Sequence, residues 1–245
     1  MPPLDLRALV DTALSAPPPD PLREQWPRFV ELDARRLEVD DVLSAARSLR
    51  VANGAGLCVD ASMLEPTRRA MQDAVPALIV SLNETQGDDI AAIAAQAGAC
   101  AGDGAEAVEL LVPLTAIEDG DIGLIGDLIE ACRTTVGPGV ALRVLMPGGA
   151  VDASVATAIA RTAVMAGVDF LGVAMLPDGT PPDLDLAAVL LSVIMEAEGK
   201  VGFKASQAQS MPASLPSLAQ AILGPEWLKP ENMRLEASHL ASPFD

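Results

Sequence analysis

Tyrosine is absent from this chain of 245 residues, histidine occurs once, at His239, and aromatic residues make up only 2% of the sequence. With one imidazole, most catalytic triads and transition-metal sites cannot be assembled. The chain has three cysteines, Cys58, Cys100 and Cys132. Their number is odd and their spacing matches no metal-binding motif, so we expect neither a disulfide framework nor a thiolate metal site. Chemistry must come from carboxylates, lysine, serine or backbone, and the sequence predicts no metal and no cofactor.

Positive charge is also scarce. The chain has 16 basic and 34 acidic residues, which gives a formal net charge of −18. A field of this sign repels nucleic acid and anionic membranes and does not attract a phosphorylated substrate. We therefore expect no nucleic-acid partner and no membrane partner, while the sequence leaves a homodimer open.

Long apolar runs are missing as well. No uninterrupted apolar segment approaches the roughly 20 residues that span a bilayer, and the segment "MPPLDLRALVDTALSAPPPDP" (1–21) lacks the basic-then-apolar order of a secretory signal. We expect a soluble, cytoplasmic protein. Three consecutive prolines in "APPPDP" (16–21) cannot continue a helix, so residues 1–27 are predicted to form an N-terminal extension that caps the domain.

Short β-type runs alternate with longer Ala/Leu-rich segments of helical periodicity over the rest of the chain. This alternation is typical of βα units around a parallel sheet, and eight units close a barrel. The prediction is an α/β fold, a single-domain (β/α)₈ TIM barrel over residues 28–245. The predicted strands are 28–34, 54–60, 77–82, 107–113, 140–146, 169–175, 200–206 and 233–238, and the predicted helices cover 40–50, 63–74, 87–104, 119–136, 155–167 and 186–199.

Two ionisable residues interrupt strands that are otherwise apolar. Glu109 lies within "AVELLVP" (107–113), and Lys204 ends "VGFK" (201–204). Active sites of TIM barrels lie at the carboxyl ends of the strands, so both residues are candidates for catalysis. The simpler interpretation is that Glu109 leans into solvent at a strand end and that Lys204 forms a structural ion pair with such a carboxylate.

Several ordered segments resemble the deoxyribose-phosphate aldolases. The resemblance runs from about Glu31 to the carboxyl terminus and is strongest in "GLCVDASMLEPTRRAM", "DDIAAIAAQAGACAGDGAEAVELLVP", "AGVDFLGVA", "VGFKAS" and "LGPEWLKPENMRLEAS". It implies three functional residues: a Schiff-base lysine on the sixth strand, a second lysine on the seventh that tunes it, and an aspartate on the fourth that assists proton transfer.

These roles are only partly matched in this sequence. The aspartate falls on Glu109, which keeps a carboxylate, and the seventh-strand lysine falls on Lys204. The Schiff-base lysine falls on Gly172, and the threonine and serine that follow it in the family fall on Val173 and Ala174. A further family lysine, in the loop after this strand, falls on Pro177. The chain has only two other lysines, Lys200 and Lys229, and neither is expected near the mouth of the barrel.

The phosphate site implied by the resemblance is also altered. The family has a Gly-Gly pair after the seventh strand and a Gly-Ala-Ser-Ser stretch after the eighth. Here these positions are Gln207 and Ala208, and Glu236, Ala237, Ser238 and His239. Side chains would project where backbone N–H groups approach phosphate, and Glu236 would add a like charge. We expect a degenerate site that does not hold phosphate.

Two hypotheses follow. In the first, the chain is a non-catalytic scaffold or a small-molecule-binding pseudoenzyme. In the second, it is a repurposed class I aldolase or lyase that acts on an unphosphorylated carbonyl compound through Lys204 and Glu109. A lysine buried among apolar groups can become nucleophilic, but an ionised Glu109 beside it would raise its pKa and favour an inert ion pair. A small carbonyl compound is therefore the candidate partner, and deoxyribose-phosphate aldolase activity is predicted to be absent.

Overall fold

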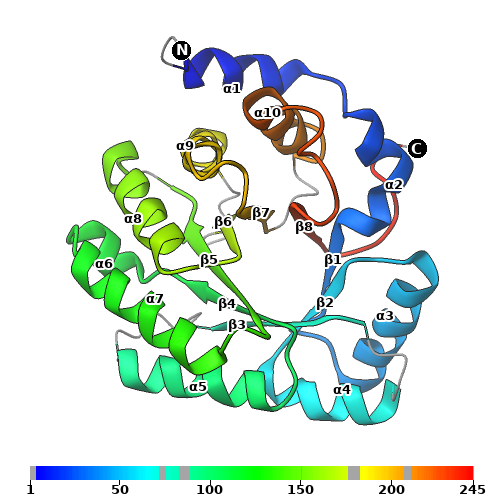
Figure 1. Ribbon diagram of the computed structural model, residues 1–245. Helices are drawn as coiled ribbons and strands as arrows, with labels where there is room; N and C mark the ends of the chain where they lie inside the picture. Colours follow the sequence, from blue (N-terminus) through cyan, green and yellow to red (C-terminus); the bar gives the residue numbers. More distant parts are fainter. Residues whose placement is uncertain are drawn as a thin grey trace.

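Eight parallel strands form a closed barrel in the order of the sequence. The computed structural model describes residues 4–71, 76–82, 89–149, 151–175, 183–206 and 211–244. Each strand pairs with its neighbours in the chain, and β8 pairs with β1 to close the ring (Figure 1). The strands are β1 (Val30–Asp33), β2 (Gly56–Val59), β3 (Leu78–Leu82), β4 (Ala107–Leu111), β5 (Ala141–Pro147), β6 (Phe170–Ala174), β7 (Gly202–Ala205) and β8 (Met233–Ala237).

Helices surround this ring of strands (Figure 1). Aspartate side chains accept a hydrogen bond from a backbone N–H in the first turn of several of them, which satisfies a donor that the helix itself leaves free. In the described part of the chain the helices are α1 (Leu6–Ser15), α2 (Asp20–Phe29), α3 (Val39–Ala52), the 3₁₀-helix η1 (Ala61–Met63), α4 (Leu64–Met71), α5 (Ile90–Gly102), α6 (Leu114–Glu118), α7 (Ile122–Val136), α8 (Ala153–Met165), α9 (Leu184–Glu196) and α10 (Ser214–Leu223).

The apolar core lies between the strands and the helices. Successive side chains of a strand face opposite sides of the sheet. On β5, Leu142 and Val144 belong to this outer core and are fully buried, whereas Arg143 faces the barrel interior, where it contacts side chains of β1 and β4. A small apolar cluster also lies inside the barrel and contains Cys58, Ile79 and Ala107. The interior above it is therefore available for polar groups.

The chain before β1 forms two helices. Residues 17–19, all proline, separate α1 from α2, and α1 packs against α9 and α10. The ring of Trp26 in α2 meets that of Phe244 edge-on, with centroids 5.5 Å apart. Since α2 runs to Phe29, directly before β1, the division at residues 27 and 28 stays a prediction.

The predicted (β/α)₈ barrel is confirmed. Each predicted strand overlaps one observed strand, with ends that differ by at most two residues. The largest differences include β4, which ends at Leu111, two residues before Pro113. The helix pattern did not predict α6 or α10, and α10 carries Pro216 in its first turn, where the missing N–H is tolerated. Among the described residues, no helix combines the length and apolarity that crossing a membrane requires.

Candidate active site

A cavity of about 400 Å³ lies at the carboxyl ends of the strands. Barrels of this kind build their active sites at this end. Ionisable side chains of the lining come from β1, β2, β4 and β8 or the loops that follow them, and most of its apolar side chains come from β4, β5 and β6. The lining residues are Asp33, Arg35, Arg36, Leu37, Asp60, Ser81, Glu109, Leu111, Leu145, Ala174, Met175, Ser206 and Glu236.

Lys204 lies inside the barrel, below this cavity. Its side chain has no exposed surface, and the residue is not part of the lining. Nζ forms an ion pair with Glu109 Oε1 and lies 3.0 Å from Glu31 Oε2 and 3.2 Å from Glu236 Oε2. Cys58 Sγ is 3.6 Å from the same nitrogen. Carboxylates from β1, β4 and β8 thus enclose the ammonium group.

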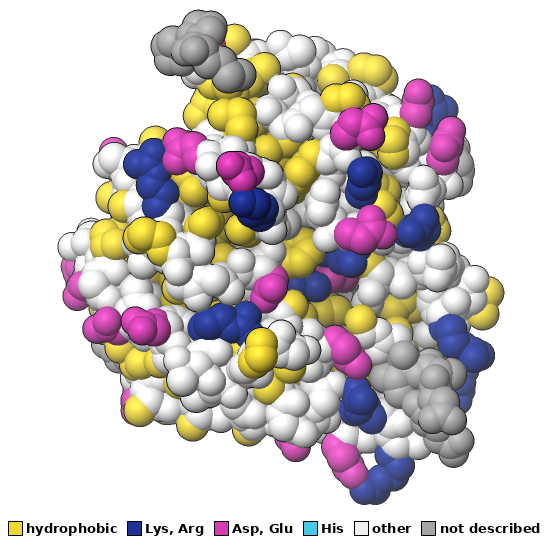
Figure 2. Space-filling view, viewed as in Figure 1, with side chains coloured by type: hydrophobic (Ala, Val, Ile, Leu, Met, Phe, Trp, Pro, Cys, Tyr) yellow, Lys and Arg dark blue, Asp and Glu magenta, His cyan; other side chains and the backbone are white. Residues whose placement is uncertain are grey.

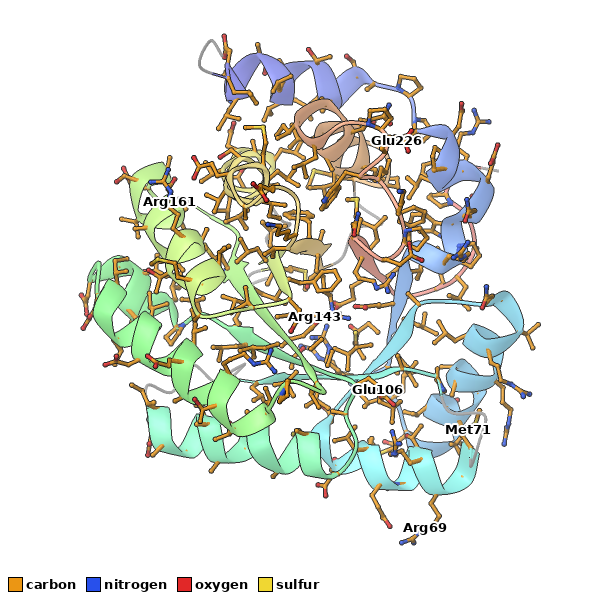
Figure 3. The ribbon with its side chains drawn as sticks, viewed as in Figure 1. Arg69, Met71, Glu106, Arg143, Arg161 and Glu226 are labelled. Atoms are coloured by element: carbon orange, nitrogen blue, oxygen red, sulfur yellow. The ribbon has the colours of Figure 1, made fainter. Side chains whose placement is uncertain are left out.

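Arg143 is a second buried cation. Its Nη1 donates to both carboxylate oxygens of Glu31, at 2.8 and 2.7 Å, and to Glu109 Oε1 at 3.1 Å. The guanidinium carbon lies 4.8 Å from the ring centroid of Phe170, a cation–π distance. Figure 3 labels Arg143 inside the ring of strands. Glu31 and Glu109 therefore each contact both Lys204 and Arg143.

Arg35 connects this cluster to the cavity. Its Nη2 donates to Glu236 Oε1 at 2.7 Å, and its Nε donates to Asp33 Oδ1 at 2.8 Å. Its Nη1 donates to Ser81 Oγ at 3.2 Å, and the Ser81 hydroxyl donates to Glu109 Oε2 at 2.9 Å. The guanidinium of Arg35 thus donates hydrogen bonds to side chains of β1, β3 and β8.

Among the described residues, the charges of this network balance. The cluster consists of four carboxylates and four cations: Glu31, Asp33, Glu109 and Glu236, with Arg35, Arg143, Lys204 and Arg234. Buried charges are strongly unfavourable unless they are paired, and each member here has an opposite charge within 4 Å. We call these eight residues the interior ion cluster. Its members share ion-pair partners, so removing one of them leaves a surplus charge in the barrel.

The electrostatic environment keeps Lys204 protonated. Burial would lower the pKa of its ammonium, but the carboxylates of Glu109, Glu31 and Glu236 outweigh burial and raise that pKa well above its usual value. For Glu31, burial acts to raise the pKa, yet Arg143 and Lys204 lower it to about 2. Burial raises the pKa of the Cys58 thiol well above its usual value, so this sulfur is protonated at neutral pH.

Glu236 differs from Glu31. Burial raises the pKa of its carboxyl group, although Lys204 and Arg35 act in the opposite direction. Its Oε1 accepts from Arg35, but its buried Oε2 accepts no hydrogen bond within the described residues. This oxygen lies 3.2 Å from Lys204 Nζ, so each oxygen of Glu236 faces a cation.

β6 contributes no polar side chain to the cavity. Gly172 is in register with Lys204 on the neighbouring strand, and Ala174 lines the cavity at the strand end. A Cβ atom added to Gly172 would lie 2.4 Å from the Lys204 carbonyl oxygen and 2.6 Å from Leu145 Cδ2. Contacts this short do not occur between real atoms, so any side chain at position 172 would push β6 away from its neighbours.

Comparison with known proteins agrees with these features. A curated deoxyribose-phosphate aldolase from Agrobacterium fabrum is 27% identical over 192 residues, which is 76% of this chain and 74% of that protein. This chain is therefore similar to the deoxyribose-phosphate aldolases over about three quarters of its length. No protein-family model matches the sequence, in keeping with its divergence.

Solved structures share the same fold. A provisionally assigned deoxyribose-phosphate aldolase from Toxoplasma gondii ME49 superposes with a TM-score of 0.77 at 15% identity, covering 94% of this chain and 93% of its own. The deoxyribose phosphate aldolase from Aeropyrum pernix, described as having a unique tetrameric structure, gives a TM-score of 0.71 at 13% identity and covers 97% of this chain and 95% of its own. At these identities the structures establish the barrel alone.

The residues predicted from the family are found in three settings. Glu109 and Lys204 contact each other, as expected, but Lys204 is buried below the cavity rather than placed in its mouth. The surrounding carboxylates hold its ammonium inside the barrel. Glu109 is itself fully buried, so the interpretation in which it leans into solvent is wrong. Val173 is fully buried and belongs to the core between the strands and the helices. Gly172 and Ala174 are described above.

The predicted phosphate-site residues are only partly described. Gln207 and Ala208 lie outside the described residues, as does Pro177. Ser238 is exposed just beyond β8. Glu236 lines the cavity, as expected for a residue at a ligand site, but its charge is offset by Arg35 and Lys204 rather than left free.

Sequence reasoning missed Glu31, Arg143 and Arg35, and it placed Glu236 only at a phosphate site. Glu31 and Arg143 each interrupt an apolar strand, which is the same signal that identified Glu109. Charged residues in five separate strands indicate a polar interior, a pattern that could have been recognised. The position of Arg35, in the loop after β1, carries no such signal.

One group of side chains has donors suited to a metal ion. Cys58 Sγ and a carboxylate oxygen from each of Glu109 and Glu236 lie within 4.8 Å of one another. Lys204 Nζ lies within 4 Å of all three residues. The ammonium therefore already supplies the positive charge that this donor set needs.

Proposed function

We propose that this barrel is a non-catalytic member of its family, a pseudoenzyme that binds a small molecule or serves as a scaffold. The observation that carries the proposal is the state of Lys204. Its ammonium has no exposed surface and lies within 3.2 Å of three carboxylates. A lysine in this setting balances charge and does not present a free amine to a ligand.

Schiff-base chemistry needs a neutral amine that can reach a carbonyl carbon. Both requirements argue against Lys204. The neighbouring carboxylates raise its pKa, despite burial, well above the usual value, and its side chain does not line the cavity. Deprotonating it would also leave the interior ion cluster with a surplus negative charge. The same carboxylates that stabilise the fold thus suppress the nucleophile.

The position of Gly172 supports the same proposal. The family resemblance puts the Schiff-base lysine at this position, and glycine supplies no amine. A Cβ there would lie 2.4 Å from the Lys204 carbonyl oxygen, so the packing of β6 against β7 leaves room only for glycine at this position. We therefore expect Gly172→Lys to disturb β6 rather than to restore cleavage of deoxyribose 5-phosphate.

The alternative is a class I aldolase or lyase that acts on an unphosphorylated carbonyl compound through Lys204 and Glu109. The direct contact between the two side chains is its support. It requires Lys204 to leave three carboxylates, lose a proton and enter the cavity. Arg35 and the lining residues Glu109 and Glu236 lie between this lysine and the cavity, so we regard the alternative as the weaker candidate.

Borohydride trapping separates the two functions. The protein is incubated with a panel of small aldehydes and ketones, reduced, and read by intact mass and peptide mapping. Exposed Lys200 and Lys229 report non-specific reaction within the same sample. We expect no adduct on Lys204. A saturable adduct on Lys204 that Lys204→Met abolishes would overturn the proposal.

A direct assay with deoxyribose 5-phosphate complements the trapping. Because position 172 lacks an amine, we expect no measurable cleavage. Turnover within roughly a hundredfold of the median enzymatic value of about 10 s⁻¹ would contradict the proposal. An active aldolase of the same family, assayed in parallel, controls for the detection limit.

Cellular location and assembly complete the proposal. We place the protein in the cytoplasm, on the charge and segment pattern of its sequence, and infer self-association as a homodimer. Fractionation of cells that express the tagged chain tests the first point. Light scattering coupled to size-exclusion chromatography tests the second, where a mass near 25.3 kDa would indicate a monomer and contradict it.

A further inference from the structure

Ser206 is a buried residue that brings an unused hydroxyl to the cavity. It directly follows β7, and only 6% of its surface is exposed. Ala205 before it belongs to the core outside the barrel, so the alternation of strand side chains points Ser206 the other way, into the cavity that it lines. Its backbone N–H donates to the Val173 carbonyl oxygen, but its hydroxyl has no hydrogen-bond partner within the described part of the chain. A buried hydroxyl without a partner is unfavourable, so a ligand that accepts its hydrogen bond is favoured.

The part of the lining next to this hydroxyl is apolar. Val173 and Ala205 are in register, so the residues that follow them, Ala174 and Ser206, lie at the ends of neighbouring strands. Most apolar lining residues come from β6 and from the two strands before it in the ring. These residues are Leu111, Leu145, Ala174 and Met175. One hydrogen-bonding group beside several apolar side chains is typical of a site that orients a small organic ligand.

The charged side chains of the lining do not call for a charged ligand. All but two of them belong to the interior ion cluster, in which carboxylates and cations are equal in number among the described residues. The other two, Arg36 and Asp60, have opposite signs and are exposed to solvent. An ionised ligand would lose hydration in the cavity without gaining an unpaired counter-charge, which is unfavourable. An uncharged ligand avoids this loss.

We propose that the cavity binds a small uncharged organic molecule in which an apolar body carries one oxygen atom, as in an alcohol or a ketone. The oxygen accepts the hydrogen bond of the Ser206 hydroxyl, and the carbon body lies against Leu145 and Ala174. The cavity volume of about 400 Å³ lies in the range that holds small organic ligands. This inference rests on the proposed function, in which the barrel binds a small molecule without converting it.

A set of compounds that share a cyclopentyl ring tests the ligand class. Cyclopentanol, cyclopentanone, cyclopentane, cyclopentylamine and cyclopentanecarboxylate are titrated into methyl-labelled protein, and affinities are read from the NMR shifts of Leu145, Ala174 and Met175. We expect the alcohol and the ketone to bind up to about tenfold more tightly than cyclopentane, as one hydrogen bond implies, and both ionised compounds to bind more weakly than cyclopentane. The ranking of alcohol and ketone identifies the preferred oxygen. Tighter binding of an ionised compound, equal binding of cyclopentane, or no response at these methyl groups would overturn the proposal.

Ser206→Ala tests the hydrogen bond itself. We expect the affinity for cyclopentanol to fall to that for cyclopentane, while the affinity for cyclopentane does not fall. The melting temperature should not decrease, because the hydroxyl has no partner among the described residues. Ser48→Ala, at an exposed position of α3 outside the cavity, is the matched control and should change neither affinity. An equal loss of affinity for cyclopentanol and cyclopentane in Ser206→Ala would indicate a change of cavity shape and would overturn the proposal.

The choice of cyclopentanol keeps this test separate from the test of the proposed function. An alcohol cannot form a Schiff base, so its binding does not depend on whether Lys204 reacts with carbonyl compounds. A borohydride-trapped adduct of cyclopentanone on Lys204 would refute the non-catalytic function and leave the cyclopentanol result to decide this inference. Failure of cyclopentanol to bind more tightly than cyclopentane would refute the inference and leave the non-catalytic function standing.

Discussion

β6 and β7 are neighbours in the barrel, yet only β7 contributes a charged side chain to its interior. Gly172 on β6 has no side chain, and Lys204, its partner in register on β7, has the largest fully buried charged side chain. The two features are linked, since the Lys204 carbonyl oxygen occupies the space that a Cβ of residue 172 would need. The comparison teaches that the buried cation is on β7, where carboxylates surround it. On β6, where they do not, the neighbouring backbone comes too close for any side chain.

The carboxylates explain why the cation is on β7. Glu236 comes from the adjacent strand β8, Glu31 from the next strand β1, and Glu109 reaches across from β4. Beside β6 the interior offers Leu145 instead. A cation at position 172 would lack comparable partners and would be strongly unfavourable. The predictions below test this contrast, from the largest expected effect to the smallest.

Removing the cation from β7 should have the largest effect. Lys204→Met leaves three buried carboxylates without their shared partner, and breaking a buried pair typically costs about 3–5 kcal/mol. Urea denaturation measures the loss. Lys200→Met removes an exposed lysine whose ion pair with Glu198 is screened by solvent and should contribute little to stability. Equal effects of the two substitutions would remove the basis for a structural role of Lys204.

A double substitution sharpens this test. Lys204→Met combined with Glu109→Gln reduces the interior ion cluster from four carboxylates and four cations to three of each. Because the charges balance again, we expect the double variant to recover a large part of the stability lost in Lys204→Met. Additive losses would show that the two groups do not act as a pair.

Glu31 should give the next largest effect, with a defined pH dependence. Its folded pKa of about 2 lies below the usual 4.5, because Arg143 and Lys204 outweigh burial. A lowered acid pKa stabilises the fold above the usual value, and this stability is lost as pH falls from about 4.5 to about 2. The shift corresponds to roughly 3 kcal/mol. Glu31→Gln should therefore be less stable than the parent at pH 7, with a difference that shrinks towards pH 2.

The control for that prediction is Glu130→Gln, at an exposed position of α7. Urea denaturation at several pH values is run on both variants and on the parent protein. The control should differ from the parent by less than about 0.5 kcal/mol at every pH. A Glu31→Gln curve parallel to that of the parent would contradict the assignment.

Placing a side chain on β6 should have a smaller effect. Gly172→Ala forces a methyl group against the Lys204 carbonyl oxygen and Leu145 Cδ2, and overpacking of this kind typically costs about 1–3 kcal/mol. Gly139→Ala is the control, because a Cβ there meets nothing within 4 Å. Melting temperatures compare the two. A Gly172→Ala variant as stable as the control would mean that β6 and β7 can separate at little cost.

The smallest expected effect concerns Ser81. Its hydroxyl donates to Glu109 and accepts from Arg35, so Ser81→Ala removes one link without removing a charge. Hydrogen bonds to charged groups typically contribute about 1.5–3 kcal/mol. We expect a loss of about 1.5 kcal/mol, at the lower end of this range, because Arg35 and Glu109 each keep another charged partner. Ser15→Ala, at an exposed helix end, should lose less than about 0.5 kcal/mol.

The barrel and part of its interior could be predicted from the sequence. Alternating strand and helix patterns predicted the fold, and a single charged residue in an apolar strand identified Glu109 and Lys204. The full cluster could not be predicted, because Glu31 meets Glu236 and Lys204 only when β1 pairs with β8. That contact depends on closure of the ring rather than on local spacing. The depth of Lys204 likewise follows from three partners that are distant in the chain.

The charge state of Lys204 is the most direct test of the non-catalytic function. The chain has three lysines, so ¹⁵N-lysine labelling gives a spectrum in which exposed Lys200 and Lys229 serve as references. The ordinary lysine pKa is about 10.4. Because carboxylates raise the pKa of Lys204, we predict that its side-chain nitrogen keeps the signal of a charged ammonium beyond the pH at which an ordinary lysine loses it. A Lys204 nitrogen that loses its proton near pH 7 to 8 would contradict the account and favour a repurposed aldolase.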